Sequence, residues 1–231
     1  MDYYCLNDDI GFVKLMQHVG DDLSIVNSAR VCYNDKSDSI NDKDRKLIKF
    51  LLDNKHETPL EHNSMTFLVK CPLFVARQWH RHRIGISINE VSGRYTVVPD
   101  EIYVPSAIFK EFRIASKSNK QVSELDSLDT IDQESCREIY AKSTSQAFEA
   151  YHQLIAHGVA REQARAVLPL ATYTQFYWTC NLRSLLHFIN LRDHKDAQWE
   201  IQQYAKNMLE QAKDIFPETI NILLDKNKDL N

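Results

Sequence analysis

Residues 65 to 71 read Met-Thr-Phe-Leu-Val-Lys-Cys, with an apolar side chain at every odd position. A period of two is typical of a strand with one buried face, so the odd positions are expected to face a core. Pro72 follows at once, and proline is favoured in the first turn of a helix. The sequence therefore predicts a strand that leads directly into a helix, which we expect to end near Arg83.

Strands and helices are interspersed along the rest of the chain. Residues 171–180 are β-branched and aromatic, which favours a strand, and residues 11–18 predict another. Apolar spacing and capping residues predict helices from about residue 21, over 43–54, 58–61, 132–157 and 160–167, from Asn181 to about 191, and from about 196. In the short helix, Thr58 is expected as the N-cap.

The β and α segments do not alternate regularly. We therefore expect α+β architecture in a single domain over residues 1–231, with an antiparallel or mixed sheet flanked by several helices, including long helices. The polar stretch 109–132 predicts a mobile insertion, because it offers few apolar side chains for packing.

The overall composition narrows the classes of function. The chain has 231 residues, 43% of them apolar, and a formal net charge of −4, which disfavours a general nucleic-acid binder. It contains no long apolar run and no secretory signal, so we expect a cytoplasmic protein without a membrane partner. The five cysteines form no Cys-x-x-Cys pair, and His80 and His82 lack further ligands nearby. We therefore expect neither disulfides nor a metal site.

Residues 81 to 94 read Arg-His-Arg-Ile-Gly-Ile-Ser-Ile-Asn-Glu-Val-Ser-Gly-Arg. Arginine binds phosphate and carboxylate groups through two parallel hydrogen bonds, and the serines and asparagine add short donors. The two glycines allow the backbone to approach a ligand closely. The segment therefore predicts a site for an anionic ligand.

The arginines are concentrated in two windows. Eight of the 12 arginines lie in segments that contain none of the 16 lysines. The first window holds Arg77, Arg81, Arg83 and Arg94, and the second holds Arg161, Arg165, Arg183 and Arg192. We infer two halves of one anionic-ligand pocket, because arginine suits enclosed anion sites better than lysine does. Structural ion pairs with some of the 32 acidic residues are the alternative.

Common nucleotide-binding and catalytic patterns are absent from the sequence. The five glycines do not form Gly-x-Gly-x-x-Gly, and no P-loop pattern occurs. Any nucleotide must therefore be held by side chains and loop amides. No serine or cysteine stands beside a base that would activate it, so we expect Ser92 to bind rather than to attack a substrate.

The segment 81–94 closely resembles the signature of the flavin-dependent thymidylate synthases, also called the thymidylate-synthase-complementing family. Further matches follow in the same order along most of the chain, and the polar stretch 109–132 is not covered. These matches are Gly20-Asp21-Asp22-Leu23, Ala29-Arg30-Val31, His56-Glu57-Thr58-Pro59 with Glu61-His62, Arg77-Gln78-Trp79, Ala164-Arg165, Leu168-Pro169-Leu170, Asn181-Leu182-Arg183-Ser184 and Asn190-Leu191-Arg192.

The resemblance implies an enzyme that methylates dUMP at C5 to give dTMP. The carbon would come from 5,10-methylenetetrahydrofolate and the hydride from FAD reduced by NADPH, with tetrahydrofolate released. The resemblance also implies a homotetramer with active sites between subunits. Its partners would be small molecules, namely dUMP, folate and NADPH, with no nucleic acid and no membrane.

The resemblance further implies roles for individual residues. Arg192 matches an arginine placed against the uracil ring and is expected to be catalytic. The positions expected to bind dUMP are Gln78, Trp79, His80, Arg81, Glu90, Val91, Ser92, Gly93, Arg94, Arg165 and Arg192. The positions expected to bind FAD are Thr58, Arg81, His82, Arg83, Glu90, Asn181, Leu182, Arg183 and His187.

The chain departs from the family pattern in three places. Eight residues separate Arg83 from Ser92 where seven are usual, so we expect a bulge near Gly85-Ile86. Cys32 stands where a flavin-contacting serine is common, and His187 stands where an asparagine is common. Both side chains keep some hydrogen-bonding ability, which is weaker for the thiol.

Two other classes of function fit parts of the sequence. A nucleic-acid binder could use Arg81 and Arg83 for phosphates, with Trp79 and Tyr95 for stacking, and would be colourless. A flavoprotein that only oxidises NADPH would be yellow, yet it would leave C5 of dUMP unchanged.

Overall fold

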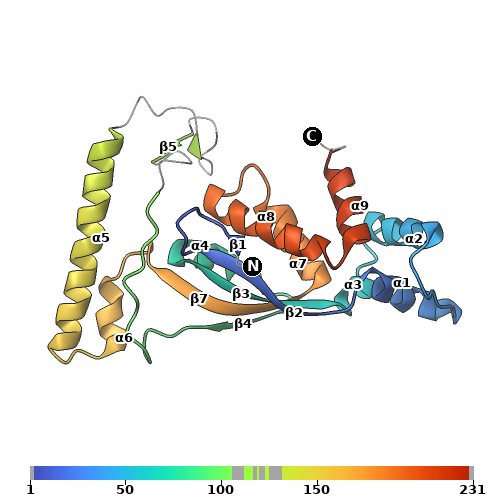
Figure 1. The fold of residues 1–231 in the computed structure, drawn as a ribbon, viewed down its shortest axis with the longest axis horizontal. Coiled ribbons are helices and arrows are strands. Elements are labelled where there is room, and N and C mark those ends of the chain that lie inside the picture. The colour runs from blue at the N-terminus through green and yellow to red at the C-terminus, as the bar shows by residue number, and fades with distance from the viewer. Residues whose placement is uncertain (1–2, 106–111, 117–118, 120–122, 125–131, 229–231) are drawn as a thin grey trace.

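The computed structural model describes residues 3–105, 112–116, 119, 123–124 and 132–228. Its central element is a five-stranded sheet in the order β1-β2-β3-β7-β4, in which all neighbouring strands are antiparallel (Figure 1). The strands are β1 Tyr3–Tyr4, β2 Phe12–Val19, β3 Ser64–Pro72, β7 Tyr173–Asn181 and β4 Ile86–Glu90. The α+β prediction is confirmed, with the antiparallel type of sheet.

Helices pack on one face of the sheet and at its two ends. The face is covered by α4 Leu73–Trp79, α7 Leu182–Arg192 and α8 Trp199–Lys213 (Figure 1). One end carries α1 Asp22–Arg30, α2 Asp42–Asp53, α3 Thr58–Glu61 and α9 Pro217–Lys228. The other end carries the long α5 Gln133–Ala156 and the short α6 Arg161–Ala164.

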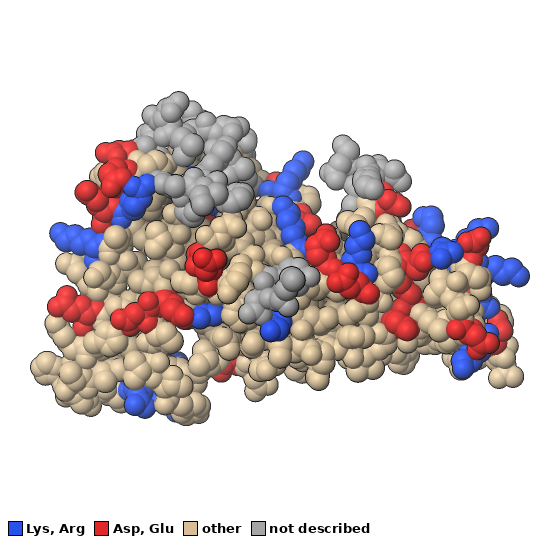
Figure 2. All heavy atoms as spheres, viewed as in Figure 1, with Lys and Arg blue, Asp and Glu red and all other residues tan. Residues whose placement is uncertain are grey.

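Charged side chains are mixed on the face of the molecule seen in Figure 2. Lysine and arginine lie among aspartate and glutamate, and neither sign gathers over a broad area of this face. A general nucleic-acid binder is expected to present a basic surface or stripe. This face of the molecule does not provide one.

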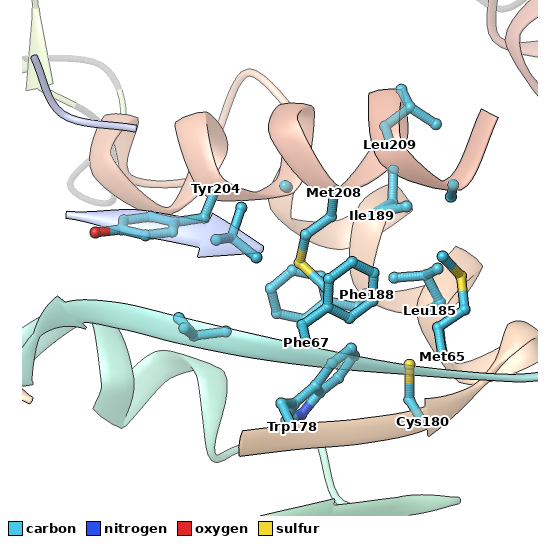
Figure 3. Close-up of a cluster of buried hydrophobic side chains, with 14 of the residues drawn as sticks. Met65, Phe67, Trp178, Cys180, Leu185, Phe188, Ile189, Tyr204, Met208 and Leu209 are labelled. Atoms are coloured by element: carbon cyan, nitrogen blue, oxygen red, sulfur yellow. The ribbon is translucent and has the colours of Figure 1, made fainter. Parts of the chain in front are cut away.

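The two central strands supply the buried face of the sheet. The apolar residues predicted at the odd positions of β3 are all buried. Phe67 of β3 lies beside Trp178 of β7, with ring centroids 6.3 Å apart. Figure 3 shows the Phe67 ring beside Phe188, with Trp178 below them and Met208 above; Phe188 and Met208 project from the covering helices. Burial of a large apolar side chain stabilises the fold by roughly 2 kcal/mol. The packing of Phe188 and Met208 on the rings of the sheet therefore holds α7 and α8 in place.

Most predicted elements are confirmed to within a few residues. The strands expected at 11–18, 65–71 and 171–180 are β2, β3 and β7. The helices expected at 43–54 and 132–157 are α2 and α5. The spacing of apolar residues, two for strands and three to four for helices, thus located the elements that have one buried face.

Four expectations were wrong in detail. The helix after Pro72 ends at Trp79 rather than near Arg83, and residues 86–90 form β4, a strand that was not predicted. The last long helix begins at Trp199, and α9 follows it. Thr58 is not the N-cap of α3, because Glu57 holds that position and makes no side-chain capping bond. Strand β4 pairs with β7, which lies far away in sequence. The available local signal was the alternation of Ile86 and Ile88 with Ser87 and Asn89.

The mobile insertion expected at 109–132 lies largely outside the described residues. Within it, β5 Ile114–Ala115 and β6 Ser123–Glu124 pair as a short antiparallel ladder. None of the helices in the described ranges has the length and apolar character needed to cross a bilayer.

Candidate functional site

Four arginines line a cavity of about 520 Å³ beside the start of β4. Arg81 and Arg83 come from the first lysine-free window, whereas Arg183 and Arg192 come from the second. Folding therefore brings parts of both windows together. The other lining residues are Glu57, His82, Ile84, Ile86, Ser184, His187 and Leu191. We call this cavity the arginine pocket.

Local backbone geometry places these side chains. After α4 the chain turns through Gly85, whose φ of 66° lies in the left-handed region that glycine adopts readily. A Cβ at Gly85 would also meet Nδ2 of Asn181 at 2.6 Å. The Asn181 side chain accepts a hydrogen bond of 2.8 Å from the Ser184 amide and so caps α7, as predicted. The Ser184 hydroxyl in turn donates to the Ile84 carbonyl at 2.7 Å, which ties the turn to the helix.

The arginine pocket carries an excess of positive charge. Arg183 forms ion pairs with Glu57 and Glu61 at 2.7 and 2.6 Å. No carboxylate in the described part of the chain forms an ion pair with Arg81 or Arg83. Unpaired guanidinium groups in a concave site favour an anionic ligand, particularly one that carries phosphate.

Arg192 is held by two acceptors that carry no charge. Its Nε donates to Nε2 of His82 at 2.9 Å, and its Nη2 donates to the Gln78 carbonyl at 3.2 Å. Burial lowers the pKa of Arg192 below its ordinary value, but arginine remains protonated at neutral pH. Burial, reinforced by the charges of Arg192 and His187, lowers the pKa of His82 to about 4. His82 is therefore neutral at pH 7, and the bond from Arg192 assigns its proton to Nδ1.

A second cavity, of about 420 Å³, lies at the other end of β4. Ile86 lines the arginine pocket and Glu90 lines this second cavity. Because an antiparallel strand advances about 3.4 Å per residue, these two residues are separated by roughly 14 Å along β4. The lining residues are Leu73, Glu90, Val91, Ser92, Gly93, Thr96, Val98, Pro99, Arg165, Leu168, Thr172, Tyr173 and Thr174. We call this cavity the turn pocket.

The turn that follows β4 gives the turn pocket the chemistry of an anion site. The Ser92 carbonyl accepts from the Tyr95 amide at 3.0 Å, and the Ser92 hydroxyl accepts from the Arg94 amide at 3.3 Å. The amides of Ser92 and Gly93 have no acceptor within the described ranges. A Cβ at Gly93 would meet Cδ of Arg165 at 3.2 Å, so glycine lets this arginine cross close to the turn. Free amides beside a guanidinium group suit a phosphate.

Sequence reasoning missed two threonines of the turn pocket. Thr174 donates a hydrogen bond of 2.6 Å to Oε1 of Glu90. The buried Thr172 hydroxyl has no partner in the part of the chain that the structure describes. In the sequence both residues were read only as β-branched strand formers. The available signal was their spacing of two, which places both on the same face of an extended segment.

The residues expected to bind dUMP divide between the two cavities. Arg81 and Arg192 line the arginine pocket. The residues that line the turn pocket are Glu90, Val91, Ser92, Gly93 and Arg165. Arg94 is exposed beside this pocket, and its Nε lies 3.4 Å from Glu162.

Three further residues expected to bind dUMP lie at the end of α4. The Gln78 side chain donates to Gln198 at 2.5 Å, while its carbonyl accepts from Arg192. Trp79 is fully buried, and its ring packs against Phe188 at 4.8 Å. His80 is half-buried, and its buried Nε2 has no partner in the described ranges.

The residues expected to bind FAD are more tightly grouped. Those that line the arginine pocket are Arg81, His82, Arg83, Arg183 and His187. Thr58 is exposed and adjoins Glu57, which also lines this pocket. Leu182 is fully buried in the core, and Asn181 is the cap of α7. Glu90 lies at the turn pocket instead.

Within one chain, the eight arginines do not all line one cavity. Four of them line the arginine pocket and Arg165 lines the turn pocket. Arg77, Arg94 and Arg161 line neither, and Arg161 donates to the Tyr95 carbonyl at 3.2 Å. Strand β4 lies between the two groups and keeps them apart.

The bulge expected near Gly85-Ile86 is absent from the strand. From Ile86 opposite Cys180 to Glu90 opposite Phe176, β4 pairs with β7 without a shift in register. The left-handed turn at Gly85 precedes the strand instead.

The other two departures from the family pattern lie in different places. Cys32 is exposed in the 3-10 turn Val31–Tyr33 and lines neither pocket. His187 lines the arginine pocket, where its ring centroid lies 6.0 Å from that of His82.

Comparisons with known proteins identify the same family over most of the chain. The family model described as thymidylate synthase complementing protein matches residues 14–218. The flavin-dependent thymidylate synthase of Thermosipho melanesiensis is 47% identical over 219 residues, which cover 95% of this chain and 93% of the relative. The enzyme of the same name from Thermus thermophilus is 45% identical over 209 residues, which cover 90% and 74%.

A solved structure shows the same fold. The UMP/dUMP methylase PolB of Streptomyces cacaoi, in a crystal structure with 5-Br dUMP, superimposes with a TM-score of 0.83 at 35% identity. The similarity covers 92% of this chain and 94% of that chain. Together with the family model and the sequence relatives, this shows that the chain belongs to the thymidylate synthase complementing protein family.

Proposed function

We propose that this protein is a flavin-dependent thymidylate synthase that converts dUMP into dTMP. It takes the carbon unit from 5,10-methylenetetrahydrofolate and uses FAD, with NADPH as the reductant. The observation that supports this most strongly is the convergence of Arg81, Arg83, Arg183 and Arg192, from two distant segments, on one cavity. With the turn pocket, the chain offers one site for a dinucleotide and a separate site, with Arg165 and free amides, for a nucleoside monophosphate.

The arginine pocket fits the charge and shape of a flavin dinucleotide. Arg81 and Arg83 lack acidic partners in the described ranges and are available to phosphate groups. Ile84, Ile86 and Leu191 add apolar surface against which a planar ring can pack. Of the residues expected to bind FAD, Arg81, His82, Arg83, Arg183 and His187 line this pocket and would hold the cofactor. When bound, the reduced flavin supplies the hydride for the reaction.

The turn pocket fits the sugar and phosphate of dUMP. The amides of Ser92 and Gly93 and the guanidinium group of Arg165 would bind the phosphate. A carboxylate repels phosphate but accepts from a hydroxyl, so Glu90 would bind the sugar. Its bond from Thr174 holds the carboxylate in place for that contact.

Arg192 would act on the uracil ring. A fixed guanidinium group beside N3 and O4 stabilises negative charge there and makes C5 a better nucleophile. Because His82 and the Gln78 carbonyl orient Arg192 without pairing its charge, the positive charge remains available to the ring. We therefore assign Arg192 as the catalytic residue.

The separation of the two cavities supports sites that are shared between protomers. We infer a homotetramer in which the turn pocket of one chain faces the arginine pocket of another. Ile84 at the arginine pocket is 81% exposed, and Tyr95 beside the turn pocket is 73% exposed. In the proposed arrangement both side chains would be covered by the neighbouring protomer.

One experiment tests the proposed function against its rivals. Purified protein is reconstituted with FAD, and dTMP is measured chromatographically with dUMP, the folate donor and NADPH, omitting each in turn. The proposal expects flavin absorbance and dTMP only in the complete mixture. UMP is tested in parallel, because the structural relative PolB is named as a UMP/dUMP methylase. NADPH oxidation without dTMP would favour the oxidase, and a colourless protein that binds oligonucleotides would favour the nucleic-acid binder.

A further inference from the structure

The orientation of Arg192 depends on groups outside its own helix. Arg192 is the last residue of α7, and its long side chain has several rotatable bonds to restrain. Arg192 donates the two bonds that restrain it, to His82 Nε2 in the turn after α4 at 2.9 Å and to the Gln78 carbonyl near the end of α4 at 3.2 Å. These bonds use two of the five guanidinium N–H groups. The remaining donors can then serve a ligand in the arginine pocket.

The His82 side chain is itself fixed. It is 9% exposed, and its ring packs edge-on against Phe188 with centroids 4.9 Å apart. Its amide donates to the Trp79 carbonyl at 3.0 Å. A group that is held by both ring packing and backbone can hold its neighbour in turn.

The acceptor on His82 is neutral, and this property matters for Arg192. A carboxylate in the same place would orient the guanidinium group but would also cancel much of its charge. Burial and the neighbouring Arg192 and His187 lower the pKa of His82 to about 4, so the imidazole accepts without adding a negative charge. It also cannot act as a base through Nε2, because that lone pair is already engaged by Arg192.

We propose that His82 is a positioning residue for Arg192, in which its neutral Nε2 aims the guanidinium group into the arginine pocket without reducing its charge. This inference rests on the proposed function and deepens it, since it concerns how the catalytic arginine is held. It is a separate role from any contact that His82 makes with the flavin. It predicts that the effect of His82 on methyl transfer passes through Arg192.

A double-mutant cycle tests this coupling. The proteins are wild type, His82→Phe, Arg192→Lys and the double variant, all as flavin-loaded holoenzymes with turnover normalised to bound flavin. His82→Phe keeps a planar ring but removes the acceptor, and Arg192→Lys keeps the charge but loses the planar fork. His82→Phe is expected to lower kcat for dTMP formation on the order of 10²-fold in the wild-type background, and only about threefold or less beside Arg192→Lys.

The conservative variant His82→Gln provides the rescue. Its amide oxygen can accept near the position of Nε2, so kcat is expected within about fivefold of wild type. Additive losses in the cycle would overturn the proposal, since a flavin contact or a purely structural role would act equally in both backgrounds. A folded His82→Gln protein as defective as His82→Phe would overturn it too.

A measurement without any His82 variant covers the case in which His82→Phe fails to fold. Protein labelled with ¹⁵N-histidine is studied by long-range ¹H–¹⁵N correlation. His82 is expected with a protonated Nδ1 and an unprotonated Nε2, and with a different tautomer balance in Arg192→Ala. A protonated Nε2 in the wild type would overturn the proposal. Failure of the wild type to make dTMP would instead refute the proposed function, so the two failures are distinguishable.

Discussion

Thr174 donates a hydrogen bond of 2.6 Å from its hydroxyl to Oε1 of Glu90, and this bond joins the start of β7 to the end of β4. The Thr174 side chain is buried, whereas Glu90 lines the turn pocket. The bond therefore connects the rigid sheet to a group that we assign to the sugar of dUMP.

Thr174→Val removes this donor at nearly constant volume. Loss of a hydrogen bond to a carboxylate is expected to lower the free energy of unfolding by about 1.5–3 kcal/mol. The freed Glu90 should also raise KM for dUMP several-fold, with little change in flavin occupancy. Urea unfolding and steady-state kinetics measure the two effects.

Thr172→Val is the matched control for that prediction. The Thr172 hydroxyl is buried without a partner in the described ranges, so its removal should leave the free energy of unfolding unchanged or raise it. Equal destabilisation by the two valine variants would show that the bond to Glu90 is not the cause.

Gly93→Ala should weaken dUMP binding through Arg165. The added Cβ would lie 3.0 Å from Cγ2 of Val98 and 3.2 Å from Cδ of Arg165, so the arginine must move. We expect KM for dUMP to rise roughly tenfold, as for the loss of one good contact. Gly158→Ala is the contrasting variant, because nothing lies within 4 Å of its Cβ but its φ is 82°. It should lose about 1 kcal/mol of stability and keep its KM. A similar rise in KM for dUMP in both Gly93→Ala and Gly158→Ala would contradict this account.

The stability of the protein should fall as the pH drops from about 6.5 to about 4 because of His82. Its folded pKa of about 4 lies below its ordinary value of 6.5. In that window the unfolded chain binds a proton that the folded chain does not, which favours unfolding by about 1.4 kcal/mol per pH unit. Urea unfolding of wild type and His82→Phe should show a stability difference that changes with pH in this range. A difference independent of pH would mean that His82 is not the titrating group.

Shared active sites predict complementation between two inactive variants. Arg165→Ala disables the turn pocket and Arg192→Ala disables the arginine pocket. If each site takes one pocket from each of two chains, co-expression of the variants should restore about a quarter of the sites. Each variant alone is the control. No recovery in mixed oligomers of confirmed composition would place both pockets of a site in a single chain.

Burial patterns made much of the fold predictable from the sequence. The alternation over 65–71 and the aromatic run over 171–180 located β3 and β7, because each strand must bury one face. The edge strand β4 was missed, although Ile86 and Ile88 alternate with Ser87 and Asn89, because this alternation is short and the segment was interpreted by its arginines and glycines. Its formation depends on partners in β7, a tertiary relation that a local pattern does not contain.

The candidate site was predictable only in part, for a related reason. The absence of lysine around eight arginines pointed to enclosed anion sites, and the resemblance separated dUMP from FAD positions. The sequence did not reveal that β4 divides these residues between two cavities. Nor did it reveal the bond between Arg192 and His82, since a contact across 110 positions has no signature in residue type or spacing.

The most direct test of the central claim is the release of tritium from dUMP labelled at C5, which reports substitution at the reacting carbon. We predict that the flavin-loaded wild type releases tritium in step with dTMP formation when the folate donor and NADPH are present. The Arg192→Ala holoenzyme should keep its flavin but release at least about 10²-fold less tritium. Undiminished release by that variant, or none from the flavin-loaded wild type, would contradict the account.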